Sequence, residues 1–416
     1  MLLILGVVLA ALAALNRRYG QSWLYPPAAF CGIWSALAIG LILTGRTFDP
    51  ISIDVQFLYA AGALSFSIGG LFSDRLRVAS GRVEAEGAVK PQRGMTVIQR
   101  RMLVVGAIVL VGILPVYWRA IVAMSAASAM PDLWRGIRAQ AVAASEGDIG
   151  MGLLGLVPPF ATFFTLIAVY LRPRLTTERV LVGIIVVAGL AVHILSAARL
   201  GAFVTLFGLA AVLWLRDGRI KTRHLALFVV SFSLVFAFAA VMLGKGGTRD
   251  AGFLDNVRML ADSFRIYLLG GLVAFDKVVR DNIPASPPYY TLRFFYAVAK
   301  AMGWNTEVPP ILLPFVTVPD FTNVYTIYYP YYTDFGTAGL CLLTGLLGGV
   351  LTALYRKARA GRPVPAVLYS LAFAFLLLSS SLEGFAVSLS YWIQAVIFVS
   401  VFFRLPGWWS RIRPTG

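Results

Sequence analysis

The chain has 416 residues, of which 59% are apolar and only 13% are charged. Soluble domains contain roughly 45–50% apolar and about 25% charged residues, so this composition excludes a water-soluble enzyme. The formal net charge of +17 does not indicate a nucleic-acid binder, because the basic residues lie in short clusters between apolar runs, which is typical of membrane proteins.

Eleven apolar runs are candidates for membrane-spanning helices, and together they predict an all-α polytopic membrane protein. The first run is shorter than the roughly 20 residues that a span needs, but no signal-peptide cleavage site follows it, so we retain it as a span. The runs cover residues 2–15, 28–44, 55–72, 102–118, 151–171, 180–198, 201–215, 225–243, 335–354, 364–381 and 386–403.

The basic residues predict how these spans are oriented, because Lys and Arg are enriched in cytoplasmic loops. One alternating set of short loops and the C-terminal tail hold 23 of the 36 basic residues, and the opposite short loops hold 5. We therefore expect the N-terminus outside and the C-terminus inside. The chain then divides into spans 1–8 (1–243), one long outer loop (244–334) and spans 9–11 with a cytoplasmic tail (335–416).

The long outer loop begins with an amphipathic pattern. In residues 251–280, apolar side chains recur at helical spacing on one face. Acidic and basic side chains, Arg265 among them, lie on another face at spacings that allow ion pairs. The pattern predicts a helix that lies on the membrane surface. A second helix is predicted over residues 289–302, and from Gly303 the chain is predicted to be irregular.

Residues 321–335, which end this loop, form the most informative segment. Seven of the fifteen are aromatic, interleaved with Thr, Asn and Asp. Tyrosine rings combine an apolar face with a polar rim, which suits sugars. The alternative is an aromatic interface belt, which needs only one or two rings for each helix end. The candidate sugar-binding residues are Asn323, Tyr325, Thr326, Tyr329 and Tyr332.

Arg199 lies in a short turn between two spans that share only 36 residues, so it is expected at or slightly below the outer interface. One interpretation is snorkelling to lipid phosphate, and the other is a fixed cation for a lipid-linked pyrophosphate. Lys245 and Arg249 flank a glycine pair that suits anion binding or a flexible linker. Arg119 is an interface anchor or a further member of this cation cluster, and Arg265 is a further candidate.

Two carboxylates are candidates for a general base, since no histidine is expected on the outer face. Glu383 lies at the predicted outer turn between the last two spans, where it acts either as a base or as a helix-end group. Asp334 lies within the aromatic segment, where it acts as a base or caps a helix that starts at Phe335. We rank Glu383 slightly ahead. Without an Asp-x-Asp motif or a histidine cluster outside, we expect no metal and no cofactor.

The chain resembles a known family at several of these residues. The run Thr322-Asn-Val-Tyr-Thr326, followed by Tyr332-Thr-Asp-Phe-Gly336, is similar to the Wzy-type O-antigen polymerases, which polymerise oligosaccharide repeat units. The Arg199-Leu-Gly turn and the single dominant outer loop before the last three spans are also similar to that family.

The resemblance implies a GT-C-like glycosyltransferase in the bacterial inner membrane. Its donor is a growing glycan on undecaprenyl pyrophosphate, and its acceptor is a repeat unit on the same carrier. The implied partners are these lipid-linked oligosaccharides, membrane lipid and a chain-length regulator protein, with no nucleic acid. Fixed arginines are suited to stabilising the pyrophosphate leaving group without a metal.

Two alternatives remain open at the level of sequence. An O-antigen ligase shares the donor and the layout, but that family is known for a histidine in its large outer loop, which this chain lacks. A lipid-linked oligosaccharide flippase or exporter needs charged spans around a polar cavity, and these spans are nearly free of charge.

Overall fold

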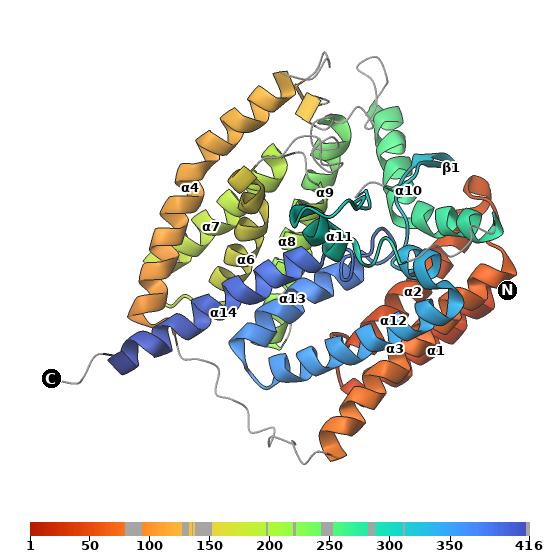
Figure 1. Cartoon of the computed structure of the whole chain (residues 1–416), viewed down its shortest axis with the longest axis horizontal. Coiled ribbons are helices and arrows are strands. Elements are labelled where there is room, and N and C mark those ends of the chain that lie inside the picture. The colour runs from red at the N-terminus through yellow and green to blue at the C-terminus, as the bar shows by residue number, and fades with distance from the viewer. Residues whose placement is uncertain are drawn as a thin grey trace. The chain divides into compact units, whose positions relative to one another are not determined.

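The structure is a computed structural model, and it describes residues 1–79, 94–126, 133–134, 136–137, 152–196, 199–218, 222–242, 253–281, 288–310 and 313–412. The described chain is almost entirely helical, with one two-stranded hairpin (Figure 1). Each of the eleven predicted spans overlaps a described helix, which confirms the all-α polytopic class, although the predicted span 364–381 ends as a helix at Leu377.

Eight of the described helices are long and apolar enough to cross a membrane, and three further apolar helices are shorter. These spans are helical because lipid offers no hydrogen-bonding partners, and a helix pairs its backbone N–H and C=O groups internally. The shorter three are α9 (Thr222–Met242), α13 (Pro363–Leu377) and α14 (Leu389–Ile412), whose apolar parts have 10–17 residues.

The chain divides into two compact units, which we describe separately. Unit 1 comprises Met1–Glu86, Ala261–Arg356 and Phe375–Ser390. Its elements are α1 (Leu2–Gly20), α2 (Pro26–Leu43), the short η1 (Gly45–Thr47), α3 (Ile53–Ala79), most of α10 (Phe253–Arg280), α11 (Arg293–Ala301), β1 (Val316–Val318), β2 (Asp320–Thr322) and most of α12 (Tyr328–Arg359).

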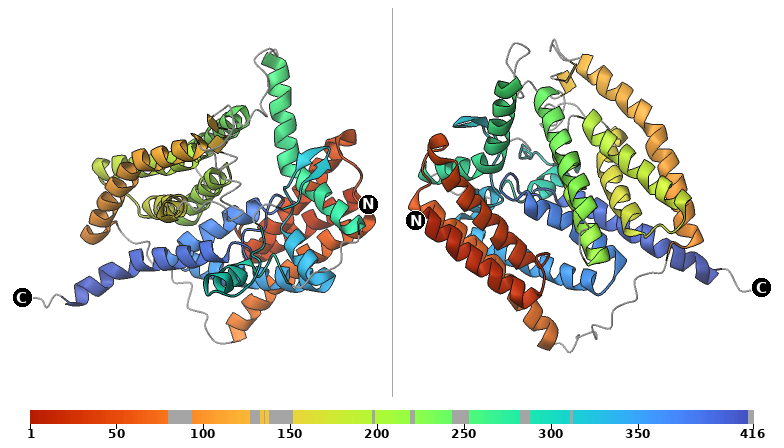
Figure 2. Two further views of the ribbon diagram at one scale, coloured as in Figure 1. Left: turned by 45° about the horizontal axis from the view of Figure 1, so that its top comes forward. Right: turned by 180° about the vertical axis from the view of Figure 1, so that it is seen from behind.

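The membrane helices of unit 1 pack through small residues. Figures 1 and 2 show α1, α2 and α3 side by side with α12. A methyl group on Gly69 of α3 would lie 1.8 Å from the carbonyl oxygen of Gly345, and one on Gly348 of α12 would lie 2.1 Å from that of Phe66. Only glycine permits this approach, which is a common way for membrane helices to associate.

An aromatic cluster fills the space between α2, α3, α10 and α12. The ring of Tyr328 lies 4.6 Å from that of Trp34 and 5.6 Å from that of Tyr59, and Phe275 of α10 lies 5.9 Å from Tyr59. All four side chains are buried. The C-terminal half of α10 is therefore part of the core of unit 1, whereas the sequence analysis placed the whole helix on the membrane surface.

A buried ion pair joins α3 to α12. Arg356 donates from Nε and Nη2 to the two Asp74 oxygens at 2.9 and 2.7 Å, and the Tyr25 hydroxyl donates to Oδ2 at 3.1 Å. Removing a carboxylate from water costs free energy, and the two hydrogen bonds from Arg356 compensate for that cost at Asp74. The ion pair lies near the C-terminal end of α3.

Unit 2 comprises Gly87–Leu260, Lys357–Ala374 and Tyr391–Gly416. Figure 2 shows its helices α6, α7 and α8 side by side. His193 of α7 joins them, because its Nε2 lies 2.9 Å from Thr162 Oγ1 of α6 and 3.2 Å from Thr205 Oγ1 of α8. The elements of unit 2 are α4 (Val97–Ala126), η2 (Gly152–Leu156), α6 (Val157–Tyr170), α7 (Thr176–Leu195), α8 (Arg199–Asp217), α9, and most of α13 and α14.

The region before α12 differs from its prediction in two ways. The predicted irregular stretch contains the antiparallel hairpin β1–β2, in which Thr317 pairs with Phe321. A short helix over residues 328–335 precedes the helix that was predicted to start at Phe335, and Pro330 fits within the first turn of this short helix. Gly336, with φ of 65°, then interrupts α12. The second predicted helix, 289–302, is confirmed in shorter form as α11.

Candidate functional site

Three segments that are distant in the sequence meet at one end of unit 1. They are the C-terminal half of α10, residues 313–335 and the loop 378–388, and we call this region the Glu383 end. The Ile327 N–H donates to the carbonyl oxygen of Ser379 at 2.8 Å, and the Ser381 hydroxyl donates to that of Tyr267 at 2.9 Å. The loop 378–388 is largely buried, which is unusual because a buried loop must satisfy its backbone polar groups.

Glu383 satisfies that requirement for the loop. Its Oε1 accepts hydrogen bonds from the N–H groups of Phe385 and Ala386 at 2.8 and 2.9 Å, and its Oε2 accepts one from Val387 at 2.7 Å. The Tyr331 hydroxyl of α12 donates to Oε1 at 2.8 Å. Burial raises the pKa of the Glu383 carboxyl above its ordinary value, and these four donors oppose that rise.

The four donors are unevenly divided between the two Glu383 oxygens. Oε1 accepts three hydrogen bonds, whereas Oε2 accepts one. A carboxylate offers about four lone-pair sites, two on each oxygen. The remaining capacity to accept a proton therefore lies on Oε2.

Asp334 holds a different segment in place. Its Oδ2 accepts from the Thr291 N–H at 2.7 Å and from the Thr291 hydroxyl at 2.6 Å, and its Oδ1 accepts from the Tyr290 N–H at 3.2 Å. These donors lie just before α11, so the carboxylate clamps the start of α11 to the first turns of α12. The cap predicted for Asp334 stays a prediction, since Asp334 lies two residues before Gly336, where the two helical segments of α12 meet.

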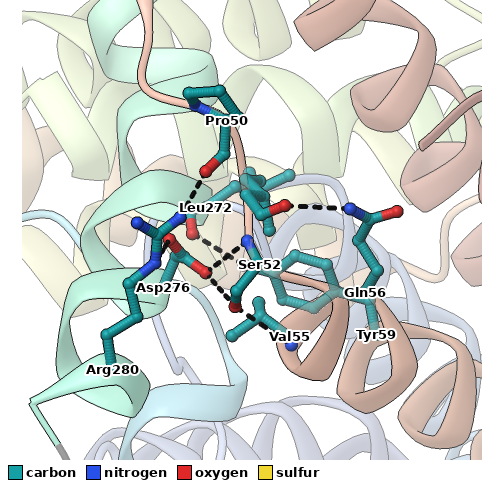
Figure 3. A network of polar contacts seen from close by, with 9 residues as sticks. Pro50, Ser52, Val55, Gln56, Tyr59, Leu272, Asp276 and Arg280 are labelled. Carbon is teal, nitrogen blue, oxygen red and sulfur yellow. Dashed lines mark hydrogen bonds and ion pairs between the residues drawn. The ribbon is translucent and has the colours of Figure 1, made fainter. Parts of the chain in front are cut away.

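A third buried carboxylate, Asp276, fixes α10 to the start of α3 (Figure 3). The Ser52 N–H donates to Asp276 Oδ1 at 2.8 Å, and the Ser52 hydroxyl donates to the same oxygen. Arg280 Nε pairs with Asp276 Oδ2 at 2.7 Å, and Arg280 also donates to the Pro50 carbonyl oxygen. The Tyr59 hydroxyl donates to the Leu272 carbonyl oxygen at 2.7 Å. These contacts make α10 a rigid support for the Glu383 end.

The predicted sugar-binding residues are mostly inside the protein. Tyr325, Thr326 and Tyr329 are buried, and Asn323 and Tyr332 are half-buried. The rings of Tyr325 and Tyr329 lie 4.3 Å apart, and the Tyr325 hydroxyl donates to the Pro314 carbonyl oxygen at 3.0 Å. Burial raises the pKa of Tyr325 to about 12, so this residue stays protonated at neutral pH and is unsuited to act as a tyrosinate base.

The predicted cations are distributed over both units. In unit 1, Arg265 pairs with Asp262 at 2.8 Å and donates to Thr47 Oγ1 at 2.9 Å, and its side chain is about one-third exposed. In unit 2, Arg119 is exposed on α4, and Arg199 is the first residue of α8. The side chain of Arg199, together with Lys245 and Arg249, lies outside the described residues.

Sequence reasoning missed three residues that organise the Glu383 end. They are Tyr331, Thr291 and Asp276, which bind Glu383, Asp334 and Ser52 respectively. The partners are 52, 43 and 224 positions apart, so no local pattern could reveal the pairs. Within the described ranges, no group of three or more His, Cys, Asp and Glu side chains is arranged to hold a metal ion.

These observations define the class of the protein as an all-α polytopic membrane protein with a buried, carboxylate-centred loop site. The chain is similar to an O-antigen polymerase of Shigella dysenteriae, with 28% identity over 131 residues, which is 31% of this chain. The match spans 33% of that relative, about a third of its length. No protein-family model matches the chain, and no solved structure matches it.

Proposed function

We propose that the chain is a polymerase of lipid-linked oligosaccharide repeat units in the bacterial inner membrane. The observation that carries this proposal is the similarity to an O-antigen polymerase, which falls on a chain of the expected all-α polytopic class. In this proposal the Glu383 end faces the periplasm, as the distribution of basic residues predicts. The N-terminus is then periplasmic and the C-terminus cytoplasmic.

The proposed reaction transfers a growing glycan from undecaprenyl pyrophosphate to the incoming lipid-linked repeat unit. A hydroxyl oxygen of the acceptor sugar forms a bond to the anomeric carbon of the donor glycan. The bond from that carbon to the pyrophosphate oxygen breaks, and undecaprenyl pyrophosphate leaves as an anion. The acceptor proton goes to a protein base, so the atoms and charges balance.

We propose Glu383 Oε2 as the atom that takes this proton. It keeps accepting capacity, whereas Oε1 is fully engaged by Tyr331 and the loop. A general base works best when its pKa lies near the working pH, and burial moves the pKa of Glu383 in that direction. Asp334 is the second candidate, since its Oδ1 accepts only the 3.2 Å bond from Tyr290.

The leaving pyrophosphate needs positive charge, which we assign to arginines and a lysine in place of a metal. Arg199 is the first candidate, with Lys245, Arg249, Arg119 and Arg265 as further contributors. The aromatic segment contributes to sugar binding through its half-buried members, Asn323 and Tyr332.

The experiment is a reconstitution of the purified protein in liposomes with synthetic lipid-linked repeat units. A polymerase lengthens the lipid-linked glycan, and EDTA leaves the rate unchanged. A flippase moves the substrate across the bilayer without lengthening it. A ligase transfers the glycan only when a lipid A–core acceptor is added. The products of the polymerase and the ligase separate by gel mobility, and a protection assay across the liposome membrane detects translocation.

A further inference from the structure

Helix α11 presents an apolar face that no described part of unit 1 covers. Five large apolar side chains in and beside α11 are exposed, and four of them recur at helical spacing of three or four residues along one face. Phe295 (56% exposed) and Val298 (41%) lie within α11, Leu292 (36%) and Met302 (68%) are its two capping residues, and Trp304 (65%) lies just beyond. Clustered exposure of this kind marks an interaction surface, whereas single exposed apolar residues do not.

The start of α11 is fixed to a helix that crosses the membrane. Thr291 is clamped to Asp334 of α12, and Arg293 Nε donates to the Pro309 carbonyl oxygen at 2.8 Å. Beyond the break at Gly336, two residues after Asp334, α12 carries an exposed apolar stripe, and we assign this stripe as the lipid-facing side of the span. The stripe consists of Leu342, Leu346 and Val350, and Phe335 is exposed just before the break. The clamp therefore places α11 at the level where the lipid-facing surface of α12 ends.

The charges of α11 match a lipid surface. The helix contains Arg293 and Lys300 and no acidic residue. Lys300 is exposed and, five positions after Phe295, lies on the opposite side of the helix from it. Short amphipathic helices with basic residues opposite an apolar face bind in the plane of the membrane interface, with aromatic side chains at headgroup level.

We propose that α11 is an interfacial helix whose apolar face is inserted into the bilayer at the boundary between headgroups and acyl chains. Phe295, Val298 and Met302 contact acyl chains, Lys300 faces water and lipid phosphate, and Trp304 lies among the headgroups. Through the Thr291–Asp334 clamp, this helix sets the height of the Glu383 end above the membrane. The inference does not depend on the proposed enzymatic activity.

The test uses the full-length protein in nanodiscs that contain anionic lipid. Single nitroxide labels are attached at Phe295→Cys, Val298→Cys and, as the matched control, Lys300→Cys, with Cys31 and Cys341 replaced by alanine. Power saturation then compares collisions with oxygen, which partitions into lipid, and with a water-soluble nickel chelate. We expect the oxygen-to-nickel ratio to be at least several-fold higher at positions 295 and 298 than at 300.

Two results overturn the proposal. Equally low oxygen-to-nickel ratios at all three positions mean that the face is in water, and low accessibility to both reagents at 295 and 298 means that protein covers it. A second measurement needs no cysteine variants. The difference in fluorescence between the wild-type protein and Trp304→Phe gives the emission of Trp304. Lipids brominated near the headgroup should quench this emission, and the absence of quenching contradicts the insertion of α11.

Discussion

The Tyr331 hydroxyl of α12 donates a 2.8 Å hydrogen bond to Oε1 of Glu383 in the loop between α13 and α14. Both side chains are buried. Glu383 is itself bound by three backbone N–H groups of its own loop, so Tyr331 is the side chain that ties this loop to α12. The pair links the folding of the loop to the position of the proposed base.

Tyr331→Phe should weaken both roles of this pair. A hydrogen bond to a charged group contributes about 1.5–3 kcal/mol, so the melting temperature in detergent should fall. The Tyr331 hydroxyl lowers the pKa of Glu383, and its loss should raise that pKa further. If Glu383 is the base, the acidic limb of the rate profile moves to higher pH. Tyr369→Phe, at another buried tyrosine with no role in the proposed site, is the control, and an unchanged limb in Tyr331→Phe contradicts the assignment.

Glu383→Gln and Asp334→Asn distinguish the two candidate bases. Both amides keep the size of the side chain and some acceptor capacity, but neither takes up a proton. The variant of the true base should lose at least 100-fold in turnover while still binding lipid-linked substrate. Turnover is measured as glycan extension, and binding as retention of a labelled substrate. Full turnover in both variants rules out either carboxylate as the base.

The Asp74–Arg356 pair should contribute to stability alone. Its carboxylate is buried and its arginine half-buried, and the pair lies at the end of α3 opposite the Ser52 contact, so it has no part in the proposed chemistry. Removing one partner of a buried pair costs about 3–5 kcal/mol, because the other charge is left uncompensated. Asp74→Asn should therefore lower the melting temperature strongly while the surviving folded protein keeps its specific activity. A selective loss of turnover without destabilisation assigns the pair a functional role instead.

Arg199 should be needed for turnover and not for insertion. Arg199→Ala should abolish glycan extension with the protein still present in membranes at its normal level. Arg199→Lys should restore only part of the rate, because lysine lacks the planar fork that binds two phosphate oxygens. Chain-length analysis by gel separates these outcomes, with Arg119→Ala as a comparison. Normal chain lengths in Arg199→Ala cells leave Arg199 as a lipid anchor only.

The sequence was sufficient to place the spans, because an apolar run in lipid has no stable structure except a helix. It failed where tertiary contacts decide the structure. Tyr328–Phe335 resembles an irregular aromatic stretch, yet it is helical because Gly62 makes room for the Tyr328 ring and Ile327 is held by Ser379. The amphipathic stripe correctly predicted α10 as a helix, but not the burial of its second half.

The candidate site was accessible to sequence reasoning only in part. Glu383 and Asp334 stand out because carboxylates are rare beside membrane spans. Their partners, Tyr331 and Thr291, are ordinary residues, and only the fold brings them near. The tyrosines predicted to bind sugar were also hard to place from sequence, since a segment rich in tyrosine is equally compatible with an exposed surface and a buried core.

The most direct test of the proposed function is glycan extension by the purified protein in liposomes, followed over time with a fluorescent lipid-linked repeat unit. The account predicts a ladder of products that differ by one repeat unit and that disappears in Glu383→Gln or Arg199→Ala. Translocation of the labelled unit across the bilayer with no product longer than one repeat contradicts it.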